Sequence, residues 1–350
     1  MSAPTTGAGA KAAKPMMLVL MGVPDSQRAH LQWQGWDKPV ALVSDGTASF
    51  LAQIKDLPVT LRSVVLGDKA LRIEGKIPRV PVVNFMADAD VYGRGLSQAT
   101  HFLRKMGTPC FNHPSAVLAT TRDGVARALD GVAGLVVPRT VKVTVNTRAQ
   151  LKAAMDEAGI RLPVIVRLAG DHGGVSTARV DDETQWEALN PLGWGGRPIY
   201  LTQFVDYADA DGRYRKLRLV VVGGHVFARH QIVSDNWLVH GRSRVEGFAD
   251  EERRVVQSFD RDLLPALGPV ARDIAGRLRL DYFGIDASLR PDGRLLLFEA
   301  NATMNSLLLP KGHPDWMPPV VERISGALAM LLAQPAQWRH QPAGGDPPAV

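Results

Sequence analysis

Residues 280–305, LDYFGIDASLRPDGRLLLFEANATMN, are the stretch that decides the fold. Two apolar segments predict two strands, and the Pro-Asp-Gly sequence at 291–293 predicts the turn between them. The first strand carries Asp286, and the second ends in Glu299 and Asn301, which are two residues apart and therefore share a face. The register stays open. A two-residue loop puts Asp286 diagonal to Glu299 on one face, whereas a three-residue loop needs a bulge to bring them together.

These three side chains predict a metal site. Two carboxylates and an amide oxygen are costly to bury in an apolar sheet without a partner. Hard oxygen ligands that converge on one point suit Mg²⁺, which combines carboxylates with substrate phosphates. The alternative, that Asp286, Glu299 and Asn301 are solvated residues at strand ends, stays open because exposed and buried positions alternate along such strands.

Gly284-Ile285-Asp286 and Glu299-Ala300-Asn301 resemble the metal-binding end of the ATP-grasp superfamily, and in particular its carboxylate–amine ligases similar to glutathione synthetase and ribosomal-protein glutamate ligase. The resemblance spans residues 112–305. It implies an α/β to α+β fold in which two α+β subdomains clamp ATP, preceded by a Rossmann-like pre-ATP-grasp domain. It also implies ATP and Mg²⁺ as cofactors, with two ions on Asp286, Glu299 and Asn301, and Mn²⁺ as an alternative ion.

Length and composition fit this organisation. A chain of 350 residues with 45% hydrophobic residues can bury a large core and divide into two or three subdomains. We expect residues 1–15 and the Pro/Gly-rich residues 334–350 to be disordered, because they have little to bury. Between them we expect a pre-ATP-grasp domain at 16–114, a small ATP-grasp subdomain with a glycine-rich lid at 115–200, and a C-terminal subdomain with the magnesium site at 201–333.

The bulk properties disfavour a membrane protein and a nucleic-acid binder. No apolar run approaches the ~18 residues of a transmembrane helix. The apolar residues 16–23 are too few for a signal peptide and are closed by Pro24. The net charge of +6 comes from dispersed basic residues, and a basic cleft for phosphates and carboxylates accounts for it as well as nucleic acid does. Whether the chain forms a homo-oligomer stays open.

Cys110 is the single cysteine of the chain. One cysteine excludes an intramolecular disulfide and suits a reducing, cytoplasmic environment. His113 is close enough in sequence to form a nucleophilic pair with it. Because Cys110 stands in a short apolar piece, however, we expect it to be buried packing.

Short apolar runs alternating with amphipathic stretches predict an α/β layer in the first part of the chain. Its expected strands are 17–20, 40–43, 63–66 and 80–85, and its expected helices are 47–55 and 96–106. Farther on we expect helices at 115–129, 147–158 and 320–332, a helix opened by Pro269, and strands at 136–138, 163–167, 200–204, 217–222 and 225–230. Gly223-Gly224 predicts a hairpin between the last two of these strands.

Residues 163–180, PVIVRLAGDHGGVSTARV, predict a strand, a glycine-rich loop and a second strand. Gly170, Gly173 and Gly174 permit positive φ angles and close backbone approach, so their amides can face phosphate oxygens. An ordinary hairpin fits the pattern about as well. By its place in the chain, the loop resembles the lid that ATP-grasp enzymes fold over the triphosphate to exclude water from a reactive intermediate.

Two arginines stand where the resemblance places ATP-binding lysines. Arg167 ends the strand before the glycine-rich loop, and Arg122 precedes a helix. The arginine fork binds phosphate well, although its geometry differs from that of lysine. The resemblance implies that Arg122 and Arg167 bind the phosphates, and the alternative is that each is an ordinary surface arginine.

Residues 201–207, LTQFVDY, resemble the hinge strand of the ATP clamp. The resemblance implies that the backbone of Gln203, Phe204 and Val205 hydrogen-bonds adenine while apolar neighbours enclose the ring. Any buried edge strand has the same pattern. The equal candidates for the ribose hydroxyls are Asp206, Asp209 and Asp211.

Arg218 resembles the arginine that glutathione synthetase-like enzymes place over the acyl phosphate, so Arg218 and Arg167 are the expected catalytic residues. Strand alternation puts Lys216, Arg218 and Val220 on one face. Two cations on an apolar strand are not expected to be buried unpaired. Related ligases often have an acidic residue where Lys216 stands.

A polar, basic run without helical or strand periodicity follows the predicted hairpin. It is a candidate substrate loop for a carboxylate-bearing molecule, and a solvated connection is nearly as compatible with it. The candidate substrate residues are His230, Ser234, Asn236, His240, Arg242 and Arg244 in this run, together with Asn305 after the metal segment.

The resemblance implies ATP-dependent carboxylate–amine ligation through an acyl phosphate, with Arg122, Arg167 and Arg218 around the migrating phosphoryl group. Its substrates would be a small-molecule carboxylate and an amine, with an amino acid or peptide as the expected class. The alternative is an ATP-binding protein that keeps the clamp but has lost ligase chemistry, which the arginines at the two lysine positions favour. A basic nucleic-acid binder is a third hypothesis.

Overall fold

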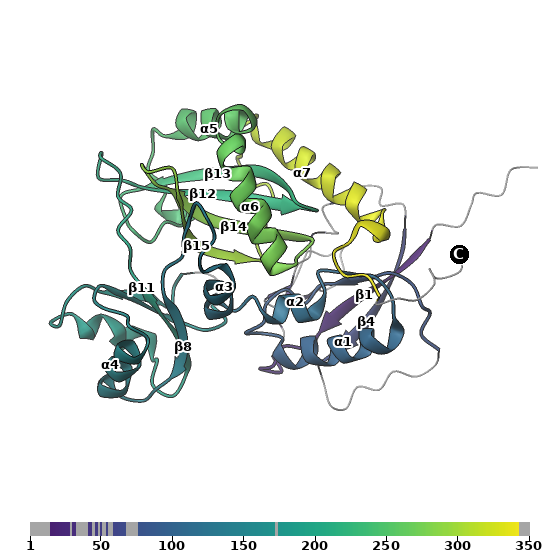
Figure 1. Cartoon of the computed structure of the whole chain (residues 1–350), viewed down its shortest axis with the longest axis horizontal. Coiled ribbons are helices and arrows are strands. Elements are labelled where there is room, and N and C mark those ends of the chain that lie inside the picture. Colours follow the sequence, from purple (N-terminus) through teal and green to yellow (C-terminus); the bar gives the residue numbers. More distant parts are fainter. Residues whose placement is uncertain are drawn as a thin grey trace, which may run out of the picture.

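The computed structural model describes residues 15–28, 30–32, 41–43, 46–47, 50, 54, 59–67, 76–171 and 174–342. The predicted helix at 47–55 and the predicted loop residue Gly173 lie largely or wholly outside these ranges, as do residues 1–14 and 343–350. The described part forms three regions, each a sheet with helices beside it (Figure 1). This mixed α/β structure confirms the predicted fold class. No helix in the described ranges is long and apolar enough to cross a membrane.

The N-terminal layer is a parallel sheet with the strand order β4-β1-β5-β6. These strands are Thr60–Leu66, Met16–Gly22, Val82–Asn84 and Cys110–Phe111, and α1 (Gly93–Met106) packs beside β1 and β4. The four consecutive residues Met17, Leu18, Val19 and Leu20 are all buried, so both faces of β1 are covered. A separate antiparallel pair, β2 (His30–Gln32) and β3 (Ala41–Val43), includes most of the strand predicted at 40–43.

The small subdomain is an antiparallel sheet with the strand order β10-β9-β11-β8. The strands are Thr177–Val180, Val164–Leu168, Pro198–Gln203 and Thr140–Thr144, accompanied by α4 (Arg148–Glu157) and a 3₁₀ helix, η2 (Trp186–Leu192). Its buried side chains, among them Leu151, Val166 and Trp186, form an apolar core separate from that of the rest of the molecule. The subdomain is therefore an independently packed unit.

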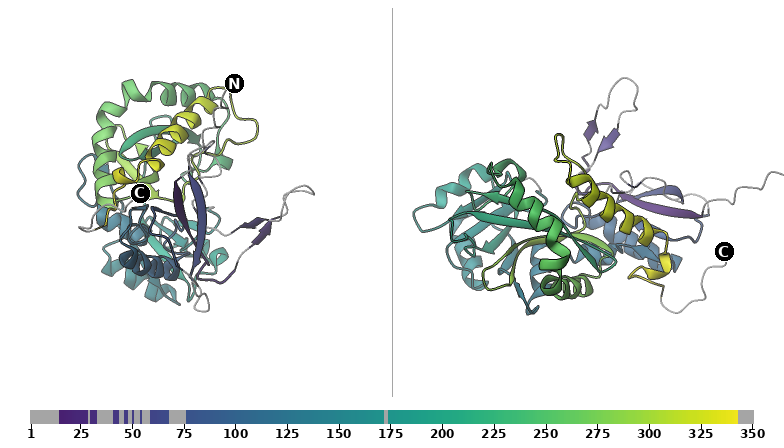
Figure 2. Two further views of the ribbon diagram at one scale, coloured as in Figure 1. Left: turned by 90° about the vertical axis from the view of Figure 1, so that its right-hand side faces the viewer. Right: turned by 90° about the horizontal axis from the view of Figure 1, so that it is seen from above.

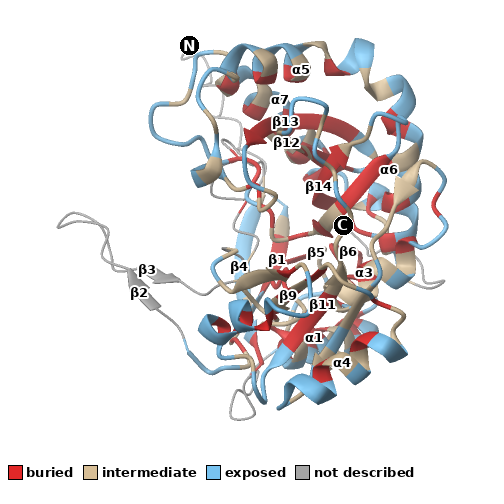
Figure 3. Ribbon diagram, turned by 90° about the vertical axis from the view of Figure 1, so that its left-hand side faces the viewer, coloured by how far each residue is buried: buried red, intermediate tan, exposed pale blue. Residues whose placement is uncertain are grey.

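The C-terminal sheet has the strand order β13-β12-β14-β15-β7 and is antiparallel except for β7. Its strands are His225–Ser234, Tyr214–Val222, Tyr282–Leu289, Leu295–Asn301 and Leu135–Val136, and β12, β13 and β14 are buried over most of their length (Figure 3). The helices α5 (Ala249–Asp262), α6 (Leu264–Leu278) and α7 (Met317–Leu332) pack against it, and α7 runs on toward the N-terminal layer (Figures 1 and 2). Gly223 and Gly224 form the predicted hairpin with φ angles of 57° and 94°.

The helix predicted at 115–129 is broken into α2 (Pro114–Leu118) and α3 (Arg122–Leu129). Thr121 causes the restart, because its extended backbone and its hydroxyl, which accepts a hydrogen bond from the amide of Gly124 at 3.3 Å, form a new N-cap. The break places Arg122 in the first turn of α3, close to β15.

In the C-terminal half one predicted helix start is wrong and one helix was missed. Pro269 does not open a helix but lies inside α6, which begins at Leu264 with a proline in its first turn. Helix α5 was not predicted, since its buried face consists of Glu252, Val256 and Phe259, too sparse a stripe to mark a helix.

The expectation that residues from 334 onward have little to bury is wrong for 334–342. The Trp338 side chain is 2% exposed, stacks edge-on with Phe111 at 5.5 Å between centroids, and donates from Nε1 to the carbonyl of Leu331 at 2.8 Å. His340 pairs with Cys110 through the backbone. Cys110 itself is buried, as predicted.

Candidate functional site

Four polar side chains form one row across the C-terminal sheet. His230, Arg218, Asp286 and Glu299 are directly opposite one another on the adjacent strands β13, β12, β14 and β15. Residues paired in this way project to the same face of a sheet. The row therefore assembles residues that are up to 81 positions apart in the chain.

A β-bulge resolves the register that the sequence leaves open. Residues 291–293 form a three-residue loop, closed by the hydrogen bond from the amide of Arg290 to the carbonyl of Arg294 at 2.9 Å. The pairing then shifts, so that Leu297 faces Ala287 while Glu299 faces Asp286, and Phe298 is the extra residue. Because Asn301 pairs with Gly284 two positions farther on, all three predicted metal ligands share one face.

Asp286 is buried and held by two cations of its own sheet. Its side chain is 3% exposed, and its oxygens accept from Arg218 Nε at 2.6 Å and Nη2 at 2.7 Å, with Lys216 Nζ at 3.2 Å. Burial by itself would raise the pKa of Asp286, but the neighbouring Arg218 and Lys216 charges hold that pKa well below its usual value. The carboxyl is therefore ionised at neutral pH.

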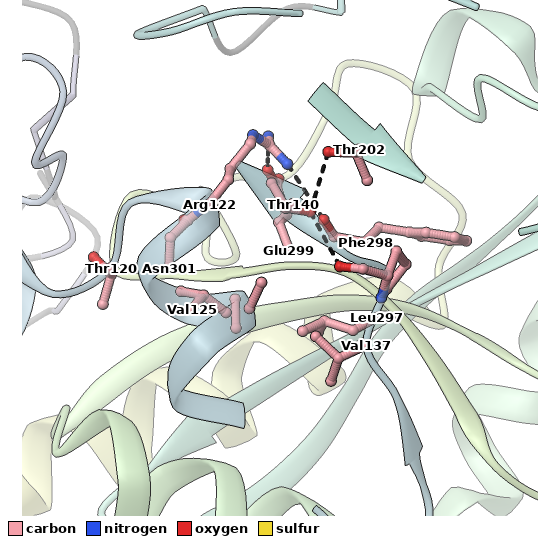
Figure 4. Close-up of a pocket in the computed structure, with 13 residues that line it drawn as sticks. Thr120, Arg122, Val125, Val137, Thr140, Thr202, Leu297, Phe298, Glu299 and Asn301 are labelled. Carbon is pink, nitrogen blue, oxygen red and sulfur yellow. Dashed lines mark hydrogen bonds and ion pairs between the residues drawn. The ribbon is translucent and has the colours of Figure 1, made fainter. Parts of the chain in front are cut away.

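Glu299 is held by a cation from the helix α3 rather than from its own sheet. Arg122 at the start of α3 forms an ion pair with the Glu299 carboxylate and donates to the carbonyl of Phe298 at 3.3 Å (Figure 4). Burial alone would raise the pKa of Glu299, but the charges of Arg122, Arg167 and Arg218 together hold that pKa below its usual value. Both carboxylates of the row are thus negatively charged.

Arg167 at the end of β9 is a buried cation with an unused donor. Its Nη2 donates to the carbonyl of Asp171 at 2.7 Å, while Nε is buried without a hydrogen-bond partner among the described residues. Burial and the charge of Arg122 lower the pKa of Arg167 to about 10, which leaves it protonated at neutral pH. A buried guanidinium with an unsatisfied N–H fits a site for an anion.

These charged groups line a cavity of about 200 Å³ between the small subdomain and the C-terminal sheet. Its lining includes four cationic side chains, Arg122, Arg167, Lys216 and Arg218, against the carboxylates of Asp286 and Glu299. Smaller cavities of about 50 and 30 Å³ adjoin it, and Arg122 lines all three. Figure 4 shows the 50 Å³ cavity with Arg122 beside Glu299. The excess of positive charge suits a polyanionic ligand.

The predicted hinge residues Gln203, Phe204 and Val205 also line this cavity. The Gln203 side chain is engaged within the protein, since its Oε1 accepts from the amide of Arg161 at 2.9 Å. The backbone amides of Gln203 and Phe204 also donate within the protein, to the carbonyls of Arg139 and Pro163 at 2.9 and 3.0 Å. None of the three candidate ribose residues, Asp206, Asp209 and Asp211, lines the cavity.

Trp237, which the sequence analysis missed, closes the hinge end of the cavity together with Phe204. Trp237 packs edge-on against Phe204 at 5.8 Å between centroids, and the guanidinium of Arg179 lies over both rings at 5.3 and 4.4 Å. The Tyr207 hydroxyl donates to the carbonyl of Trp237. An isolated tryptophan in an otherwise polar loop was the available signal, because such a residue seldom lacks an apolar partner.

The glycine-rich loop joins β9 and β10, which pair as an antiparallel hairpin. Gly170 and Gly174 have φ angles of 76° and 70°, and each lines one of the cavities. Asp171 fixes the loop by accepting from the amide of Ser176 at 3.1 Å and from its hydroxyl. An ordinary hairpin and a glycine loop that faces a ligand are thus compatible interpretations, because the β9–β10 hairpin places Gly170 and Gly174 at the cavities.

The candidate substrate residues divide into two groups. His230 lies in the row and His240 lines the 200 Å³ cavity. Burial, followed by the charge of Arg218, holds the pKa of His230 well below its usual value, and its Nε2 is buried without a partner among the described residues. Only His240 among the seven candidates lines one of the three cavities, and the candidates that line none are His230, Ser234, Asn236, Arg242, Arg244 and Asn305.

The donor set fits a divalent metal ion. Within the described ranges no three His, Cys, Asp or Glu side chains are grouped so that they could hold a metal ion, so an oxygen site here needs the amide as its third member. Asn301 Oδ1 is held by the amide and hydroxyl of Thr303 at 3.0 and 2.7 Å. Two ionised carboxylates and an oriented amide oxygen on one sheet face are the hard ligands that Mg²⁺ and Mn²⁺ take.

The architecture and the site together define the ATP-grasp fold, as predicted. D-alanyl-alanine synthetase A from Vibrio cholerae has a TM-score of 0.53 and 14% identity over 94% of this chain and 99% of that chain. D-alanine–D-alanine ligase from Bacillus anthracis has a TM-score of 0.51 and 11% identity over 93% and 97%. A RiPP-associated ATP-grasp ligase from Chryseobacterium gregarium, solved with ADP and a leader and core peptide, has a TM-score of 0.51 and 15% identity over 94% and 100%. No protein-family model and no curated protein match the sequence.

Proposed function

We propose that the chain is an ATP-dependent carboxylate–amine ligase that forms an amide bond through an acyl phosphate. The observation that carries the proposal is the cavity lined by Arg122, Arg167, Lys216 and Arg218 around two buried carboxylates. Such a concentration of partly buried cations is unfavourable without an anion of several charges. A nucleotide triphosphate supplies those negative charges, and two accompanying Mg²⁺ ions, or Mn²⁺ in their place, would be held by Asp286, Glu299 and Asn301.

In the first step, an oxygen of the substrate carboxylate attacks the γ-phosphorus and the bond to the β-phosphate oxygen breaks, which yields an acyl phosphate and ADP. Arg122, Arg167 and Arg218 align the phosphates and neutralise the charge that builds up on them. When bound, the metal would be held by Asp286, Glu299 and Asn301 and would supply further charge neutralisation. No general base is required for this step.

In the second step, the amine nitrogen attacks the acyl carbon, the carbon–oxygen bond to phosphate breaks, and the amine loses its proton. The glycine-rich loop between β9 and β10 would exclude water, which otherwise hydrolyses the acyl phosphate. We propose an amino acid or a peptide as the substrate class, in keeping with the ligases that share the fold.

The experiment that tests this proposal is a phosphate-release screen in which candidate acids are paired with candidate amines in the presence of Mg·ATP. Phosphate release that requires both partners, with ADP formed in equal amount, is the expected outcome. Purified protein that binds Mg·ATP but releases phosphate with no pair would favour the second candidate.

That second candidate is an ATP-binding protein without ligase activity. It is supported by Arg122 and Arg167 at the two positions where the resemblance places lysines, and by the engagement of both metal-binding carboxylates with protein cations. Nucleotide binding measured by calorimetry, separately from turnover, distinguishes the two candidates. A fluorescent oligonucleotide titration at two salt concentrations tests nucleic-acid binding, which we expect to be absent.

A further inference from the structure

Asp286 already has cationic partners on both oxygens. Arg218 donates from Nε and Nη2 to the two Asp286 oxygens at 2.6 and 2.7 Å, which makes a bidentate contact between the guanidinium and the carboxylate. Lys216, two residues earlier on β12, adds an ammonium at 3.2 Å from Oδ2. The Lys216 and Arg218 side chains are only 13% and 18% exposed, so water screens these pairs little.

The other two donors of the site are engaged in a similar way. Glu299 pairs with Arg122, and Asn301 Oδ1 accepts two hydrogen bonds from Thr303. A divalent ion that arrived alone would have to compete with the cations around Asp286 and Glu299. It would also leave buried positive charges without a counter-ion, which is costly in a poorly solvated cavity.

A nucleotide triphosphate removes this obstacle because it brings several negative charges to the same cavity. Lys216 and Arg218 both line that cavity, so both can exchange a carboxylate partner for phosphate oxygens. The two side chains differ in how firmly Asp286 holds them. Arg218 donates two hydrogen bonds to Asp286 from its planar guanidinium, whereas Lys216 reaches Asp286 through one ion pair at the end of a flexible side chain. Lys216 is therefore the side chain that can change partners with the least rearrangement.

Building on the proposed function, we propose that Lys216 shields Asp286 in the nucleotide-free protein and transfers to the triphosphate when the nucleotide binds. Lys216 thereby makes the binding of divalent metal depend on nucleotide. Since linkage is reciprocal, nucleotide increases the affinity for metal by the same factor by which metal increases the affinity for nucleotide.

The test uses Lys216→Met, which keeps an unbranched side chain only one atom shorter and removes the charge. Lys152→Met is the matched control, because Lys152 also forms an ion pair, with Glu183, but lies in the small subdomain away from the three cavities. Binding of Mn²⁺ alone is followed by the electron paramagnetic resonance signal of the free ion. Binding of ATP alone, in EDTA, is followed by calorimetry.

We expect Lys216→Met to bind Mn²⁺ without nucleotide about tenfold more tightly than the wild type, and metal-free ATP about tenfold more weakly, within the range typical of coupled sites. The control should leave both affinities unchanged. Opposite shifts in the two affinities cannot come from partial unfolding, which would weaken both. An unchanged Mn²⁺ affinity in Lys216→Met would overturn the shielding role of Lys216.

Binding of Mg·ATP by the wild type separates the two levels of the proposal. Wild-type protein that binds Mg·ATP, combined with a Lys216→Met variant that shifts neither affinity, overturns the role of Lys216 and leaves the proposed function intact. Wild-type protein that binds no ATP, with or without metal, overturns the proposed function itself.

Discussion

The C-terminal sheet has two interfaces of opposite character. Toward the N-terminal layer it is joined by one continuous apolar core, in which Phe50 lies 5.1 Å from Tyr282 and Phe111 lies 5.5 Å from Trp338 between ring centroids. Toward the small subdomain it faces a cavity lined by charged groups, and the small subdomain keeps a core of its own. The first interface therefore stabilises the fold, whereas the second encloses a cavity that a ligand can occupy.

Asn112 is fully hydrogen-bonded at the first interface. Its backbone amide donates to Asp281 Oδ2 at 2.7 Å and its side-chain amide donates to the carbonyl of Tyr282 at 2.7 Å, while its Oδ1 accepts from the amides of Asp281 and Tyr282 at 2.8 and 3.0 Å. Buried side-chain nitrogens without a hydrogen-bond partner among the described residues occur at both interfaces, on Arg339 and His340 at the first and on Arg167 at the second. The two interfaces therefore differ in the charge that lines them, and only the second encloses a cavity lined by four cations.

If this division holds, removing the Trp338 ring should affect stability alone. We expect Trp338→Ala to lower the free energy of unfolding by about 3–5 kcal/mol, as for other buried aromatic residues, because the variant empties the contact with Phe111. Urea denaturation measures this loss. ATP affinity at low temperature should stay within about twofold of the wild-type value, and a large loss of affinity would show that the two interfaces are not separate.

The complementary change is Glu299→Gln, which should affect function alone. Loss of one charged partner in such a site typically costs about 2.7–4 kcal/mol of transition-state stabilisation, a hundredfold or more in turnover. Substrate-dependent ADP release measures the effect, and Glu187→Gln at an exposed position of the small subdomain is the control. Near-normal turnover by Glu299→Gln would remove the metal assignment.

Asp281 gives the first interface a pH dependence. Burial raises its pKa to about 6, in spite of the amides of Arg339 and Asn112 that donate to it. Because the pKa of Asp281 is higher in the folded than in the unfolded protein, protonated Asp281 makes its full contribution to the free energy of unfolding below about pH 4. That contribution, roughly 2–3 kcal/mol, is lost as the pH rises through 6. Unfolding free energies at pH 4 and 7 for the wild type and Asp281→Asn should differ in pH slope. Parallel slopes would rule out Asp281 as the titrating group.

A substitution at Gly284 tests how closely β14 packs against Met304, in the loop that follows Asn301. A Cβ at this position would lie 2.3 Å from Met304 Sδ and 2.7 Å from its Cβ, so Gly284→Ala should cost about 1–3 kcal/mol and shift the loop. Gly276→Ala is the matched control, because nothing lies within 4 Å of a Cβ there and alanine favours the helix α6. Thermal denaturation compares the two, and equal melting temperatures would show that Met304 moves aside freely.

The sequence was sufficient for the parts of the site that depend on local periodicity. Glu299 and Asn301 share a face because they are two apart on a strand, and Lys216 and Arg218 do so for the same reason. Glycines 223 and 224 specify their hairpin through positive φ angles that other residues seldom adopt. These predictions needed no long-range contact.

Other features depended on partners distant in the chain and were not predictable. The break between α2 and α3 turns Arg122 toward Glu299, 177 positions away, and nothing local specifies that pair. The burial of Trp338 depends on Phe111, and Trp237 closes the cavity only because Phe204 and Arg179 lie opposite it. Tertiary packing overrides local propensity at such places.

The sequence by itself determined which atoms are available: three oxygen donors near the carboxyl end, two of them fixed on one face, and the cations that can neutralise a triphosphate. Only the tertiary structure decided that Asp286 joins the other two donors, because the extra residue Phe298 shifts the pairing by one position. Side chains alternate between the two faces of a strand, so a single inserted residue decides which face a carboxylate takes. Whether the insertion is favourable depends on how the strand then pairs with its neighbour.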